Sequence, residues 1–81
     1  MSKFKIGVKV MPREVILDTQ GRAIEQSLKL NNLEVSQARV GRFVELEIQA
    51  DTEAEAMSKA QEISKRLLCN SLIENFEMMK L

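Results

Sequence analysis

A strict alternation of polar and apolar side chains over residues 3–10 constrains the fold of this chain more than any other feature. The polar side carries lysines and Gly7, and the apolar side carries Phe4, Ile6, Val8 and Val10. A period of two residues is typical of a β-strand with one buried face. Pro12 ends the pattern because it has no N–H group to donate to a sheet. The chain therefore opens with a half-buried strand, and residues 11–17 follow as a connecting loop.

Two segments carry the signals of helices. In the first, the Asp18 carboxylate can cap a helix that ends near Asn31-Asn32, where both residues tolerate the left-handed conformation of a helix C-terminus. In the second, Thr52 and Glu55 form a capping box, and apolar residues then recur at helical spacing as far as Asn70. We therefore expect one helix within each of these limits.

Residues 33–50 form the longest stretch of β-like sequence, and its second half alternates regularly. Gly41 interrupts it, which indicates a bulge, a bend or a close backbone approach. Two structures fit, namely one long bent strand or a tight hairpin centred on Val40-Gly41. We favour the bent strand, because Val40 would need a positive φ in a two-residue hairpin turn. Residues 72–79 predict a final strand with large apolar groups on both faces.

The expected order is strand, helix, strand, helix, strand, which defines an α+β fold of two layers with a ferredoxin-like plan. We expect both helices on one face of an antiparallel or mixed sheet, and a single domain over residues 1–81. A middle strand of this length exceeds what a small domain can cover, and the last strand is apolar on both faces. We therefore expect the domain to form dimers.

Composition argues against several classes of function. The chain has no histidine and a single cysteine, Cys69, so it can form no Ser-His-Asp or Cys-His arrangement and no cysteine-rich zinc site. We therefore expect no catalytic residue and no metal site. Twelve basic and twelve acidic residues give zero net charge, which argues against binding to nucleic acid or to a membrane surface. The lack of a signal peptide or an apolar run of membrane-spanning length predicts a cytoplasmic protein.

The zero net charge combines two opposed halves. Residues 1–42 carry eight basic and four acidic side chains, a net of +4, and residues 43–81 carry four basic and eight acidic ones, a net of −4. The two halves can fold against each other, which we favour. Alternatively they make complementary contacts between copies or with a partner.

Three segments carry a family resemblance. The stretch Leu17-Asp18-Thr19-Gln20-Gly21 is similar to a Leu-Asp-Pro-Gln-Gly stretch that opens a first helix. Residues 38–46 are similar to a Val-Arg-x-Gly-Lys-x-x-Glu-Leu segment, and residues 67–76 to a closing Leu-Leu-Ala-Asn-Pro-Val-Ile-Glu-Asp-Tyr. All three of these motifs are those of the PurS family, the small subunits of phosphoribosylformylglycinamidine (FGAM) synthase. The chain resembles this family over nearly its whole length. Thr19, Arg42 and Ser71 depart from the usual Pro, Lys and Pro.

The resemblance implies a non-catalytic subunit of FGAM synthase, an ATP-dependent ligase of de novo purine biosynthesis. In this family the small subunit joins a glutaminase subunit (PurQ) and a synthetase subunit (PurL), bridges them and assists the passage of ammonia between them. The resemblance also implies a homodimer or a dimer of dimers. It further implies that this chain binds no cofactor, and that ATP and Mg belong to the synthetase subunit.

The resemblance directs attention to two groups of candidate contact residues. We expect interface contacts from Asp18, Gln20 and Gly21 at the start of the first helix, and from Arg39, Gly41 and Arg42 on the middle strand. A purely structural role is the alternative, in which the aspartate caps, the glycine bends the chain and the arginines face solvent. Two other functions stay open, a small-molecule sensor domain of ferredoxin-like plan and an RNA-binding module. With three phenylalanines and no other aromatic residue, RNA binding is poorly supported.

Overall fold

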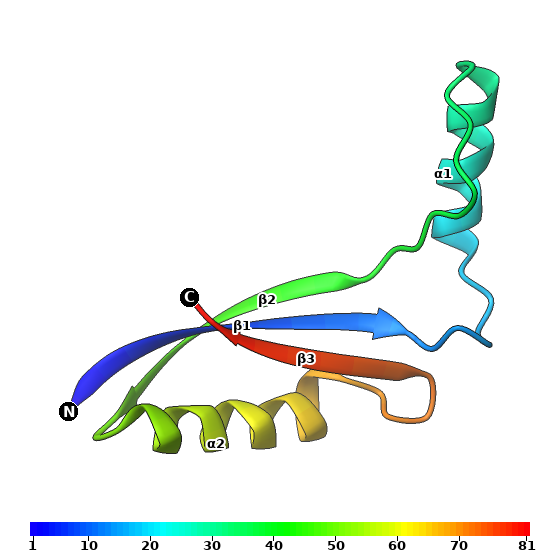
Figure 1. The fold of residues 1–81 in the computed structure, drawn as a ribbon. Helices are drawn as coiled ribbons and strands as arrows, with labels where there is room; N and C mark the ends of the chain where they lie inside the picture. The colour runs from blue at the N-terminus through cyan, green and yellow to red at the C-terminus, as the bar shows by residue number, and fades with distance from the viewer.

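The computed structural model describes all 81 residues of the chain. Residues 64–68 form a π-helical turn, labelled η1, that continues the second helix without a break. Figure 1 shows the elements in their order, which is β1 (Ser2–Pro12), α1 (Thr19–Leu30), β2 (Arg42–Ala50), α2 (Glu53–Ile63), η1 (Ser64–Leu68) and β3 (Glu74–Lys80). None of the helices has the length and apolar character needed to cross a membrane.

The three strands form one antiparallel sheet in the order β2-β1-β3. In the register of the central strand, Val8 lies opposite Val44 on one side and Met78 on the other. Because a period of two holds along all three strands, most apolar side chains of each strand meet on the same face. The predicted α+β class is confirmed, and the sheet is antiparallel rather than mixed.

The covered face of the sheet lies against α2. Ile6, Val8 and Val10 of β1 are almost fully buried, as the alternation predicts. The helix presents small residues to the sheet, since Ala56, Ala60 and Ser64 are fully buried and follow one another at intervals of four. The Ser64 hydroxyl donates a hydrogen bond to the Ala60 carbonyl at 2.7 Å, which satisfies the buried polar group. A close approach of α2 to the sheet thus depends on small side chains.

The open face of the sheet carries a charged ladder. A row of lysines on β1 faces glutamates on both neighbouring strands, with pairs Lys3–Glu47, Lys5–Glu45 and Lys9–Glu77 at 3.5–3.7 Å. All six side chains are about half exposed or more, so each pair contributes little to stability. Two large apolar side chains, Phe43 and Met79, also lie on this face and stay partly exposed.

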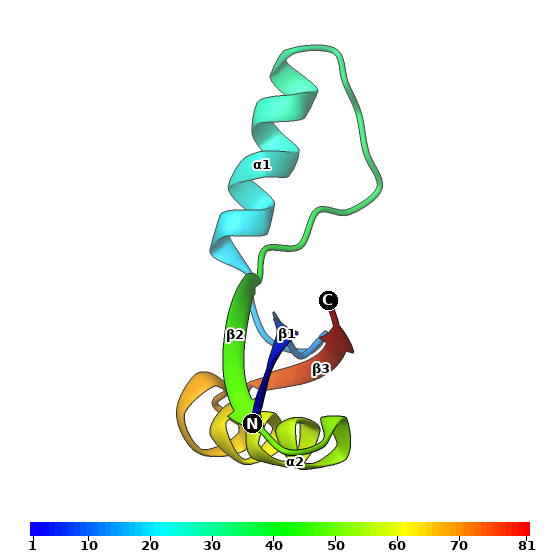
Figure 2. The same ribbon diagram turned by 90° about the vertical axis from the view of Figure 1, so that its left-hand side faces the viewer.

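The first helix does not cover the sheet. Figures 1 and 2 show α1 projecting away from the sheet at its far end, so the expectation that both helices share one face holds for α2 and is wrong for α1. Residues 31–41 return along α1 before β2 begins. We call residues 18–41, which comprise α1 and this return segment, the arm.

The long middle strand is shorter than predicted. Regular strand structure is confined to Arg42–Ala50, and residues 33–41 form no strand. The physical reason lies in β1: its pairing with β2 ends at Val10 opposite Arg42, and past Pro12 the chain turns away. Residues 33–41 therefore have no neighbouring strand to pair with. No hairpin forms at Val40-Gly41 either, and neither residue has a positive φ.

Candidate docking groove at the base of the arm

A groove of about 350 Å³ lies where the arm joins the sheet. Its walls come from the β1–α1 loop, the start of α1, the start of β2 and the start of β3. Four of the six predicted contact residues line this groove, namely Asp18, Gln20, Gly41 and Arg42. The two sequence segments that suggested contacts, residues 18–21 and 39–42, therefore meet at one place.

Asp18 caps α1 and also holds the return segment. Its Oδ1 accepts a hydrogen bond from the Gly21 N–H at 2.8 Å, and its Oδ2 accepts one from the Val40 N–H at 2.7 Å. These two hydrogen bonds, in that order, hold the pKa of the Asp18 carboxyl below its ordinary value, and the positive charge of Arg39 acts in the same direction. The predicted cap is confirmed, and the bond to Val40 is an addition that the sequence did not show.

The two predicted glycines permit close backbone contacts. A Cβ on Gly21 would overlap the carbonyl oxygen of Ala38, and one on Gly41 would overlap the carbonyl oxygen of Val10 and the sulfur of Met11. Because both glycines have ordinary negative φ values, the space for a side chain and not the backbone conformation is the restriction. The sequence indicated a bulge, a bend or a close backbone approach at Gly41, and the structure shows the close approach.

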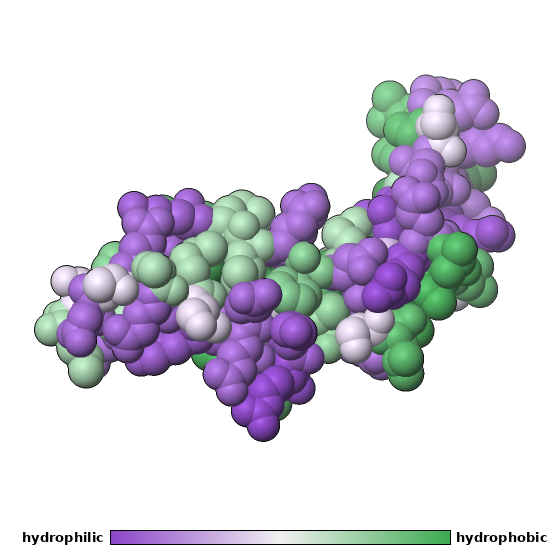
Figure 3. All heavy atoms as spheres, turned by 60° about the horizontal axis from the view of Figure 1, so that its bottom comes forward, coloured by the Kyte–Doolittle hydropathy of each residue, from purple (hydrophilic) through white to green (hydrophobic).

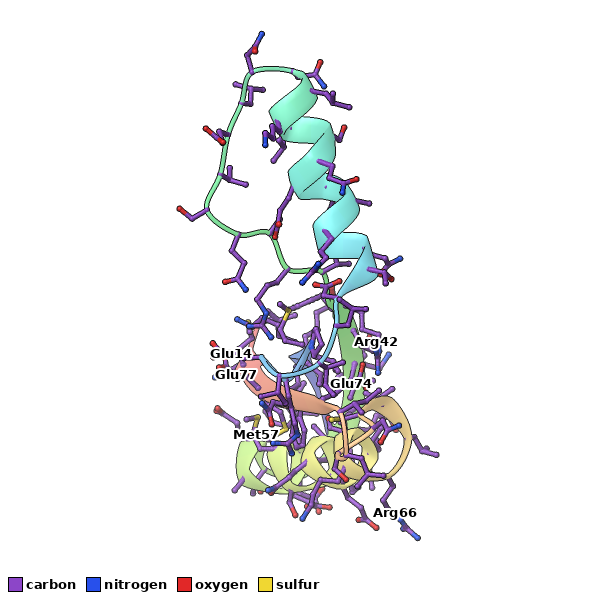
Figure 4. The ribbon with its side chains drawn as sticks, turned by 90° about the vertical axis from the view of Figure 1, so that its right-hand side faces the viewer. Glu14, Arg42, Met57, Arg66, Glu74 and Glu77 are labelled. Carbon is purple, nitrogen blue, oxygen red and sulfur yellow. The ribbon has the colours of Figure 1, made fainter.

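The two predicted arginines are both engaged within the chain. Arg39 donates to the Pro12 carbonyl. Arg42 makes a forked ion pair with Glu74, at 2.6 Å and 2.8 Å, and donates to the Leu68 carbonyl (Figure 4). The hydrogen bond to Arg42 lowers the pKa of Glu74, as does the bond from the Asn70 N–H, and the same ion pair raises the pKa of Arg42.

Gln20 differs from Asp18 and the two arginines because its exposed side chain makes no hydrogen bond within the chain. Sequence reasoning missed Glu74, Glu25 and Arg13, which complete the same region. The Arg13 guanidinium donates to the Ser71 carbonyl at 2.7 Å, and Glu25 accepts from the Ala38 N–H at 2.8 Å. Glu74 lies within the segment that carried the family resemblance, but no local pattern could indicate a partner 32 positions away.

Apolar side chains surround the groove. Val15 and Leu17 in the β1–α1 loop are 90% and 64% exposed, and Leu72 before β3 is 84% exposed. The main chains of these two loops are joined by a hydrogen bond from the Arg13 N–H to the Ile73 carbonyl at 2.8 Å. Figure 3 shows apolar residues gathered at this end of the molecule, below the arm. Contiguous exposed apolar surface of this kind is typical of a protein–protein contact.

The groove offers little for chemistry of its own. No group of three or more Asp, Glu, Cys or His side chains is placed to hold a metal ion. The thiol of Cys69 is half-buried, and burial raises its pKa above the ordinary value, with the Glu74 charge acting in the same direction. The polar groups of this small α+β domain organise its own chain, and its exposed apolar loops face outward. This arrangement is typical of a protein-binding subunit.

Comparison with known proteins identifies the family of this subunit. The family model described as PurS, phosphoribosylformylglycinamidine (FGAM) synthase, matches residues 5–80. The PurS subunit of FGAM synthase from Synechocystis is 34% identical over 70 residues, which cover 85% of this chain and 70% of that protein. The chain therefore belongs to the PurS family, a subunit of a ligase of purine biosynthesis. The resemblance predicted from the sequence is confirmed.

Solved structures show the same fold. The crystal structure of the PurS subunit from Thermotoga maritima superimposes with a TM-score of 0.94 at 28% identity, covering 99% of this chain and 93% of that one. A structure of PurLQS from the same organism contains a chain that matches with a TM-score of 0.93 at 28% identity, over the full length of both chains. The fold of this chain, the arm included, is therefore similar to that of the Thermotoga subunit.

Proposed function

We propose that this chain is the non-catalytic small subunit of an FGAM synthase complex. In the proposed complex it bridges the glutaminase subunit PurQ and the synthetase subunit PurL and assists ammonia transfer between them. The overall reaction joins formylglycinamide ribonucleotide, glutamine, ATP and water to give FGAM, glutamate, ADP and phosphate. The bridging role is supported mainly by the exposed apolar surface around the groove, which the chain by itself leaves uncovered.

The partners follow from the likeness to the Thermotoga PurLQS chain, which extends over the full length of both chains. We further propose that the chain self-associates as a homodimer or a dimer of dimers, in the cytoplasm. It binds no cofactor in this proposal, and ATP and Mg are held by the synthetase subunit. The open sheet face and the arm offer surface for contacts between copies.

Reconstitution tests the proposal directly. The purified chain is mixed with its cognate glutaminase and synthetase, and FGAM formation is measured with glutamine and, separately, with ammonia as nitrogen donor. We expect glutamine-dependent turnover to need this chain, because ammonia must pass between two subunits. Ammonia-dependent turnover by the synthetase should need it far less. Equal glutamine-dependent rates with and without the chain would contradict the proposal.

Gln20 is the cleanest probe of the predicted interface at the groove. Arg42 is less suitable, because Glu74 and the Leu68 carbonyl hold its guanidinium within the fold. We expect Gln20→Lys to weaken complex assembly on a sizing column without changing the thermal stability of the isolated chain. Gln61→Lys, at an exposed glutamine on α2, is the matched control and should assemble normally.

A further inference from the structure

The arm is joined to the sheet by two crossings of the chain, at residues 13–18 on the way out and at residues 40–42 on the way back. One carboxylate links the two crossings. Asp18 lies on the outgoing chain, and its Oδ2 accepts from the Val40 N–H on the returning chain at 2.7 Å. Its other oxygen accepts from the Gly21 N–H at 2.8 Å and so ties the start of α1 to the same group.

Three more contacts join the return segment to α1 or to the end of β1. Glu25, one turn further along α1, accepts from the Ala38 N–H at 2.8 Å. The Arg39 guanidinium donates to the carbonyl of Pro12 at the end of β1. Gly21 makes room for the Ala38 carbonyl, which a larger residue would displace. The return segment is thus held to α1 by side chains that accept from its backbone N–H groups.

Packing does not restrain the direction of the arm. The helix α1 packs on neither face of the sheet, and its apolar residue Ile24 is 45% exposed. In the return segment, Leu33 and Val35 are 61% and 45% exposed, so the arm has no core that could anchor it. A segment with few buried apolar contacts opens at a low cost in free energy, so the hydrogen bonds at the base of the arm supply the restraint that packing does not.

We propose that Asp18 and Glu25 form a carboxylate latch that holds the return segment against α1, and that this latch, together with the contact from Arg39 to the Pro12 carbonyl, sets the direction of the arm relative to the sheet. In this proposal Asp18 is a positioning residue: it contacts no partner, and it presents α1 and the groove in one fixed relation. Asp18, Gly21 and Arg39, which the sequence suggested as contacts, then fix the geometry of the interface, and Gln20 remains the candidate for direct contact with a partner. The proposal concerns the conformation of the chain itself and does not depend on the proposed complex.

Pulsed electron paramagnetic resonance measures this direction. Spin labels are placed on α1 and α2 through Lys29→Cys and Gln61→Cys in a Cys69→Ser background, and labelled chain is diluted with unlabelled chain so that only distances within one chain contribute. We expect a single narrow distance in the otherwise unchanged chain. Asp18→Asn keeps one acceptor oxygen and turns a donor toward an N–H group, so we expect the narrow distance to be lost.

Asp51→Asn is the matched control, because it removes a carboxylate from an exposed position just before α2 that makes no hydrogen bond or ion pair. It should retain the narrow distance. A narrow distance retained in Asp18→Asn would overturn the proposal. Loss of the sheet in Asp18→Asn, seen as a lower melting temperature matched by faster amide exchange in β1 and α2, would overturn it as well, since the residue would then stabilise the whole fold.

Glu25→Gln tests the outer half of the latch separately, because it weakens only the contact between α1 and the Ala38 N–H. Hydrogen exchange by mass spectrometry should show peptides from residues 31–41 exchanging roughly fivefold faster, with peptides from β1 and α2 unchanged. Unchanged exchange over residues 31–41 would contradict a role for Glu25 in the latch.

Discussion

The ion pair of Arg42 and Glu74 joins the start of β2 to the start of β3. The Arg42 guanidinium also donates to the Leu68 carbonyl at the end of η1, and the Glu74 carboxylate accepts from the Asn70 N–H. The Glu74 carboxylate is only 14% exposed, so it depends on these partners for its charge. A glutamate whose pKa is lower in the folded state adds stability above its ordinary pKa, and that stability is lost as the pH falls through the folded value.

We therefore expect Arg42→Met to destabilise the chain by about 1 kcal/mol near pH 7, a value reduced by the half exposure of the arginine. The penalty should shrink as the pH falls from 7 through the lowered pKa of Glu74, because Glu74 is then protonated in both folded and unfolded chains. Urea unfolding followed by circular dichroism across this range measures the difference. A penalty that is constant with pH would show that the ion pair is not its cause.

Two glycines allow a matched test of close packing. A Cβ on Gly41 would meet the backbone of Val10, which cannot move aside, whereas a Cβ on Gly7 would meet the end of the half-exposed Phe43 ring. We expect Gly41→Ala to lower the free energy of unfolding by about 1–3 kcal/mol. Gly7→Ala should change it by less than about 1 kcal/mol, because the ring can turn away. Equal losses in denaturant unfolding would contradict this account.

Small buried residues determine how closely the helix α2 packs on the sheet. Ala60 is fully buried against the core that includes Ile6 and Ala50, whereas Ala54 is exposed in the first turn of the same helix. We expect Ala60→Leu to cost about 1–3 kcal/mol of unfolding free energy because the helix must move off the sheet. Ala54→Leu should lie within about 0.5 kcal/mol of the unchanged chain. Thermal or urea unfolding of both variants decides the point.

The helices and strands were predicted from the sequence only in part. Local signals located β1, α2 and both helix caps, because alternation and capping depend on neighbouring residues. They could not show that residues 33–41 lack a strand partner, since this depends on where β1 turns away. The direction of α1 was missed for a similar reason: its stripe around Ile24 and Leu28 reads as a core-facing side whether the core belongs to this chain or to another. For the candidate site, the positions of Asp18 and Arg42 were predicted, but their long-range partners were not.

The arm gives the whole molecule an open shape. The radius of gyration is 16.2 Å and the molecule measures 52 × 25 × 14 Å. A compact domain of this length would have a radius of gyration of about 12 Å. A shape this open buries little surface per residue, and nine residues of 81 are buried. Association that covers the arm and the open sheet face would therefore contribute a large share of the stability.

We expect the proposed self-association to appear as a dependence of thermal unfolding on protein concentration. If copies of the chain cover the arm, the midpoint should rise by a few degrees over a hundredfold increase in concentration. Ile24→Glu should remove most of this dependence, because a half-exposed position tolerates a charge in a single chain but a covered one does not. Gln26→Glu, which places the same charge at an exposed site on α1, is the control and should retain it. Sedimentation of the same samples would show whether the species changes in size. A midpoint that does not depend on concentration, together with sedimentation as a monomer, would contradict self-association through the arm. The apolar surface of the arm would then be left for contact with other subunits.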